Sequence, residues 1–200
     1  RQEWIYSCKG NPTKFLNEYA EYFGNDSPFA WYLITDYFMA VDNRAKNMML
    51  VTWDGKIWYF IPYDMDTVFG ERNDSVLKYD YTITWETMDE SIGSYAFAGH
   101  DSVLWELVRG CPDKLREVAD KLRSTMSLEY VLKVFNEEMM GNWCERIYNK
   151  DGIYKYIKPL TEGVTTADGT TSYYDYLYAL QGSRYAHRTY TIQNRFALLD

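Results

Sequence analysis

Two β-rich runs joined by Asp54-Gly55 constrain the fold of this chain more than any other feature. The runs cover residues 48–53 and 56–61, and Asp-Gly between two such runs is a strong short-range signal of a β-hairpin. A hairpin returns its second strand to the end at which the first strand began, so the segments flanking the two runs are expected to meet. A two-residue turn also fixes the register, and the predicted partners are Trp53 with Lys56, Leu50 with Tyr59, and Asn47 with Pro62.

Acidic and amide side chains flank the predicted hairpin on both sides. Asp42 and Asn47 precede it, and Asp64 and Asp66 follow it. Three carboxylates and an amide at one place favour a site for a hard divalent cation such as Mg²⁺ or Mn²⁺, which prefers oxygen ligands. Carboxylates so close together repel one another unless a cation or a proton intervenes. The alternative is an ordinary core hairpin with polar residues at its open end.

The spacing of these residues is similar to that of the protein-kinase catalytic loop. Asp42 and Asn47 form D-x-x-x-x-N, and P-Y-D-M-D-x-x-x-G follows from Pro62 to Gly70. In kinases the Asp of that loop handles the acceptor hydroxyl and the Asn holds a magnesium ion. Over residues 27–70 the chain resembles the CotH-type atypical kinases, a family named after a spore-coat protein.

The resemblance implies a fold and a set of roles. The fold would be α+β and mostly helical: a protein-kinase-like C-terminal lobe with a central β-hairpin and a helical C-terminal half. Asp42 would be catalytic and Lys46 would contact a phosphate. Asn47, Asp64 and Asp66 would bind ATP through Mg²⁺ or Mn²⁺, with Asp66 favoured as the main metal ligand.

Several kinase features are absent from the sequence. Ala40-Val41 replaces the His-Arg of protein kinases, and Gly70 comes four residues after Asp66 rather than two. No Gly-rich loop and no strand lysine precede Asp42. We therefore expect the N-terminal lobe to lie before Arg1, which makes this chain the C-terminal part of a longer protein.

Composition limits the classes of partner. Lys and Arg total 21 against 29 Asp and Glu, a net charge of −8, which disfavours nucleic-acid binding. No apolar run reaches the roughly 18 residues of a membrane span. The three cysteines are widely spaced, which disfavours a disulfide framework or a zinc site. The 20 Tyr and 7 Trp favour an extracellular, cell-surface, coat or virion location, with protein substrates or coat and virion partners.

The length fits one domain, and the resemblance implies one kinase-like domain over residues 1–200. Helices and the catalytic hairpin occupy 1–72, a long loop 73–100, and a helical part 101–200. The expected elements are an incoming strand or loop at 1–10 with its apolar part at 3–6, a helix capped by Asn11, helices at 29–40, 103–109 and 113–126, a helix from 128 to about 147, and a final helix at 183–199. A short strand is expected at 79–85.

Three functions remain open at this point. The first is metal-dependent phosphoryl transfer from ATP to a protein hydroxyl. The second is a kinase-like module without activity that serves a structural or binding role in a coat or phage virion. The third is a glycan hydrolase with paired carboxylates. It ranks last, because D-x-D places both acids on one strand and leaves Asn47 without a role.

Overall fold

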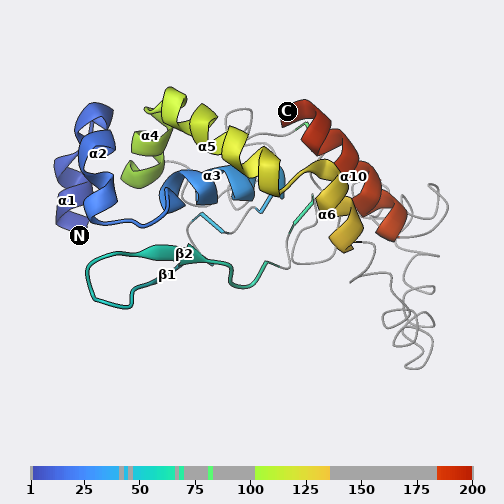
Figure 1. Cartoon of the computed structure of the whole chain (residues 1–200), viewed down its shortest axis with the longest axis horizontal. Helices are drawn as coiled ribbons and strands as arrows, with labels where there is room; N and C mark the ends of the chain where they lie inside the picture. The colour runs from blue at the N-terminus through green and yellow to red at the C-terminus, as the bar shows by residue number, and fades with distance from the viewer. Residues whose placement is uncertain are drawn as a thin grey trace, which may run out of the picture. The chain divides into compact units, whose positions relative to one another are not determined.

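The computed structural model of the chain describes residues 2–40, 43–44, 47–65, 68–69, 81–82, 102–135 and 184–199. This part is mostly helical with one small antiparallel sheet, an α+β arrangement (Figure 1). Its elements are α1 (Gln2–Ser7), α2 (Pro12–Glu18), the 3₁₀ helix η1 (Tyr19–Glu21), α3 (Ser27–Tyr37), β1 (Met49–Val51), β2 (Tyr59–Ile61), α4 (Val103–Arg109), α5 (Pro112–Thr125), α6 (Leu128–Val134) and α10 (Arg184–Leu199).

The chain divides into two compact units. The first contains residues 1–68 and 83–125, and the second contains 69–82 and 126–200. The prediction that residues 1–200 form one kinase-like domain stays a prediction. Within the described part of the chain, no helix combines the length and the apolar character needed to cross a bilayer.

The N-terminal segment is helical over Gln2–Ser7, so the strand or loop expected at residues 1–10 was wrong. The N–H of Cys8, which follows α1, bonds to the carbonyl of Trp4 in α1, and Cys8 is fully buried. The Trp4 ring stacks on Tyr22 with centroids 4.0 Å apart, and its Nε1 donates a hydrogen bond to Glu18. Short apolar runs do not distinguish strand from helix by period, and here tertiary packing decides.

Helix α2 begins where the sequence predicts, and α3 begins at Ser27, two residues before the predicted position 29. The Asn11 side chain accepts a hydrogen bond from the Lys14 N–H, and Pro12 occupies the first helical position. Helix α3 ends three residues before the predicted position 40. Met39 adopts a left-handed conformation (φ +52°), and the Ala40 N–H bonds back to the Thr35 carbonyl. This is a Schellman ending made without glycine, which explains why the sequence did not indicate it.

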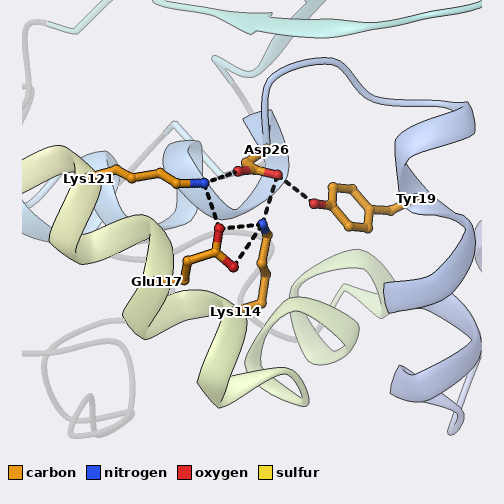
Figure 2. A network of polar contacts seen from close by, with 5 residues as sticks. All are labelled: Tyr19, Asp26, Lys114, Glu117 and Lys121. Carbon is orange, nitrogen blue, oxygen red and sulfur yellow. Dashed lines mark hydrogen bonds and ion pairs between the residues drawn. The ribbon is translucent and has the colours of Figure 1, made fainter.

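Polar contacts tie the start of α3 to α5 (Figure 2). The Asp26 carboxylate, which precedes α3, accepts a hydrogen bond from the Tyr19 hydroxyl and pairs with Lys114 and Lys121, each at 3.2 Å. Glu117 pairs with the same two lysines. Burial by itself would raise the pKa of Asp26, but the hydrogen bonds from Tyr19, Lys114 and Lys121 outweigh it and hold that pKa below its ordinary value.

The hairpin forms, but its register differs by one residue from the prediction. The observed partners are Met49 with Ile61, Leu50 with Phe60, and Val51 with Tyr59.

Trp58, which lies just before β2, forms backbone bonds outside the hairpin. The Trp58 N–H bonds to the Tyr22 carbonyl, and the Trp58 carbonyl accepts from Gly24, so Trp58 pairs with an earlier segment instead of with β1. Residues 52–58 therefore form a wider connection than a two-residue turn. Within it the Asp54 side chain accepts from the N–H groups of Lys56 and Ile57.

Helix α3 is buried over most of its surface, as predicted, and packs against β2, α4 and α5. In Figure 1 it runs between the hairpin and the α4–α5 pair. Phe60 of β2 contacts the rings of Phe23, Trp31 and Trp105, with centroid distances of 5.6 to 5.8 Å. This aromatic cluster joins the hairpin to α3 and α4.

The later helices agree with the sequence where they are described. Ser102 caps α4 and Ser127 caps α6, each through a backbone N–H three residues ahead. Two predictions cannot be compared with the structure. The continuation of the α6 helix to about residue 147 lies outside the described residues, and so does most of the strand expected at 79–85. In the second unit α6 packs against α10, and the buried Arg195 of α10 donates to the Tyr81 carbonyl at 2.8 Å.

Candidate functional site

Two tryptophans hold the backbone of the segment that precedes the hairpin. The Trp31 Nε1 in α3 donates to the Asn43 carbonyl at 2.8 Å. The Trp105 Nε1 in α4 donates to the Arg44 carbonyl at 2.7 Å. Both indoles are buried, so water has little access to the donors and acceptors of these bonds. The position of this segment is therefore set by two helices of the core.

Arg44 anchors the same segment through its side chain. The buried guanidinium lies 3.7 Å from the centre of the Tyr32 ring. Its Nε donates to the Thr35 hydroxyl, and one terminal nitrogen donates to the Tyr32 carbonyl at 2.7 Å. Asp36 lies 4.0 Å from the same nitrogen. Arg44 therefore places a positive charge near the C-terminal end of α3, where the helix dipole favours it.

Two amide side chains connect this segment to the residues that follow the hairpin. The Asn43 Nδ2 donates to the Tyr63 carbonyl at 2.9 Å, and the Asn47 Nδ2 donates to the Asp64 carbonyl at 3.1 Å. Asp64 has a left-handed backbone (φ +50°), which Asp adopts more readily than most residues. The segments expected to meet at the open end of the hairpin are thus hydrogen-bonded to each other.

Of the predicted site residues, the structure describes Asn47 and Asp64 and brings them together. Asp42, Lys46 and Asp66 lie outside the described residues. Among the residues that are described, no group of three His, Cys, Asp or Glu side chains lies together in a way that would hold a metal ion. The roles of all five residues stay predictions.

Two groups in the described part of the site are of the kind that bind hard divalent cations. The Asn47 Nδ2 already donates to the Asp64 carbonyl, so the Oδ1 of Asn47 is the side-chain atom left to bind a cation. The Asp64 carboxylate is exposed, and none of the described residues forms an ion pair or a hydrogen bond with it. An amide oxygen and a carboxylate fit Mg²⁺ or Mn²⁺.

Sequence reasoning missed the residues that support these two. Asn43 and Arg44 lie within the kinase-like spacing, but that spacing assigns them no role. Trp31 and Trp105 would count only as core residues. The bond from Trp105 to Arg44 spans 61 positions. No sequence signal indicates it.

Comparison of the chain with protein-family models, curated proteins and solved structures finds no match.

Proposed function

We propose that the chain is the C-terminal lobe of a CotH-type kinase, which transfers a phosphoryl group from ATP to a protein hydroxyl in a metal-dependent reaction. The hydrogen bond from Asn47 to the Asp64 carbonyl carries this proposal. It joins the two segments whose spacing resembles a kinase, so the resemblance concerns residues that are neighbours in space.

Each motif residue has a role in this proposal. Asp42 orients or deprotonates the acceptor hydroxyl, and Lys46 contacts a phosphate of ATP. Asn47, Asp64 and Asp66 hold Mg²⁺ or Mn²⁺, with Asp66 as the main ligand. The bound cation supplies positive charge that neutralises the phosphates.

The buried anchors of the segment support the proposal. Phosphoryl transfer depends on positioning and on charge placed in advance, because the protein contributes little covalent chemistry. A segment held by two indoles and a buried arginine keeps its geometry when a substrate binds. An ordinary hairpin end would not need three buried polar anchors.

A thermal-shift experiment tests the proposal. The unfolding temperature of the chain is measured with ATP, with Mn²⁺ and with both. We expect ATP to raise the unfolding temperature only when Mn²⁺ is present, and this ATP-dependent rise to be lost in Asp66→Ala. The double variant Asp64→Asn, Asp66→Asn should also lose stabilisation by Mn²⁺ alone.

The matched control is Asp113→Asn, Asp120→Asn, which removes the same charge from α5 at side chains that are 93% and 76% exposed. It should respond to Mn²⁺ as the wild type does. Equal stabilisation of the wild type and the site variant by Mn²⁺ would refute the site assignment.

A second proposal is a kinase-like structural or interaction module of a coat or phage virion. Exposed aromatic side chains favour it, since Trp53 in the hairpin connection is 87% exposed and Tyr63 is 55% exposed. Such residues are frequent at protein interfaces. In this case neither ATP nor Mn²⁺ would shift the unfolding temperature, whereas Trp53→Ser would weaken binding to the partner.

A further inference from the structure

Asn43 is the most deeply buried polar residue among the described residues of the two motif segments. Its side chain has no exposed surface, and its Nδ2 lies 2.9 Å from the Tyr63 carbonyl oxygen and 3.4 Å from the Asn47 carbonyl oxygen. Asn43 thus connects the residues on both sides of the hairpin in the same way as its neighbour Asn47 does.

The orientation of this amide is determined by its surroundings. Turning it over would place Oδ1 against two carbonyl oxygens, which repel an acceptor and need a donor. The Nδ2 therefore faces the carbonyls, and Oδ1 is buried without a hydrogen bond to any described residue.

A buried acceptor without a partner destabilises the folded state. Leu has nearly the shape of Asn and carries no such acceptor. Leu would remove this cost and would lose the two Nδ2 bonds, one of which is long at 3.4 Å, so the amide adds little to folding stability on balance. A contribution besides folding stability is therefore the better account of the amide.

We propose that Asn43 is a positioning residue that sets the divalent-cation affinity of the candidate site. This inference rests on the proposed function. Asn43 fixes the distance between the segment that carries Asn47 and the segment that carries Asp64 by bonding to main-chain carbonyls of both. Groups that orient metal ligands without touching the metal typically change metal affinity 10- to 100-fold when removed.

The test measures Mn²⁺ binding to wild type and to Asn43→Leu by electron paramagnetic resonance of free Mn²⁺, without nucleotide. The control is Asn194→Leu, which makes the same substitution and also removes an Nδ2–carbonyl bond, in α10. Urea unfolding is measured on all three proteins. We expect the Mn²⁺ dissociation constant of Asn43→Leu to rise about 10- to 100-fold, with an unfolding midpoint no lower than that of the control.

The outcomes separate the two proposals. Wild type that does not bind Mn²⁺ refutes the metal site and this inference with it. Wild type that binds, together with Asn43→Leu that binds equally well, refutes only the positioning role. If Asn43→Leu does not fold, Asn43→Ser is measured in the same way, since it keeps a donor on a shorter side chain. Loss of folding in both variants overturns the inference, because Asn43 would then be required for the fold itself.

Discussion

Replacing Trp105 with Phe removes one of the two indole bonds that hold the segment before the hairpin. Trp105 is fully buried in α4, and its Nε1 lies 2.7 Å from the Arg44 carbonyl oxygen. Phe keeps an aromatic ring against Phe60 but has no donor. The Arg44 carbonyl would then remain in the core without its indole partner.

The free energy of unfolding should fall for two reasons. Leaving a buried carbonyl without its donor costs about 1–3 kcal/mol. The smaller ring leaves a void, which costs about 1 kcal/mol more. We therefore expect Trp105→Phe to lose about 2–4 kcal/mol, a large part of the stability of an ordinary domain.

Urea unfolding followed by far-ultraviolet circular dichroism measures this loss, since tryptophan fluorescence would change with the substitution. The control is Trp53→Phe, the same chemical change at a side chain that is 87% exposed. It should change stability by less than about 0.5 kcal/mol. Equal losses of unfolding free energy in the two variants would show that the indole bond to Arg44 does not hold the segment. The proposed function would then lose the support that it draws from the buried anchors.

Two further predictions concern the first unit. The folded pKa of Asp26 lies below its ordinary value of 3.8, so its contribution to stability is present above that value and is lost as pH falls through the folded pKa. Asp26→Asn should therefore cost about 1 kcal/mol near neutral pH and almost nothing in strong acid. Urea titrations across that range check this, and a cost independent of pH would contradict it. A Cβ on Gly24 would overlap the Tyr59 ring, so Gly24→Ala should cost about 1–3 kcal/mol. In a double-mutant cycle, Tyr59→Leu should recover part of that cost, and strictly additive losses would exclude the overlap.

The parts of the fold that follow from local chemistry could be predicted from the sequence. Helices were expected directly after Asn11, at 103–109 and from 128, and each is capped by the side chain before it, Asn11, Ser102 or Ser127. The parts that depend on distant contacts could not. The wide connection at residues 52–58, in which Trp58 bonds to residues 22–24, is one such feature, and neither partner indicates the other in sequence.

The candidate site divides in the same way. Asn47 and Asp64 meet because a hairpin brings its two ends together. The one-residue change of register does not separate them: continued by two residues, the observed pairing sets Asn47 opposite Tyr63, the neighbour of Asp64. The supporting contacts of Arg44 depend on side-chain conformations inside the core. Spacing alone suggested Lys46 as the basic residue of the motif and gave no reason to expect that Arg44 is buried against α3.

The position of the candidate site therefore depends on the core of the first unit. Trp31 and Trp105 both contact Phe60 of β2, and both donate to the segment that contains Asn43 and Arg44. The same aromatic cluster thus places the hairpin and the segment before it. Closely packed interiors transmit small displacements, so a change in this cluster should alter the distance between Asn47 and Asp64 without touching either one. Substitutions at Phe60 that keep the fold are accordingly expected to affect cation binding more than equally destabilising substitutions in α5.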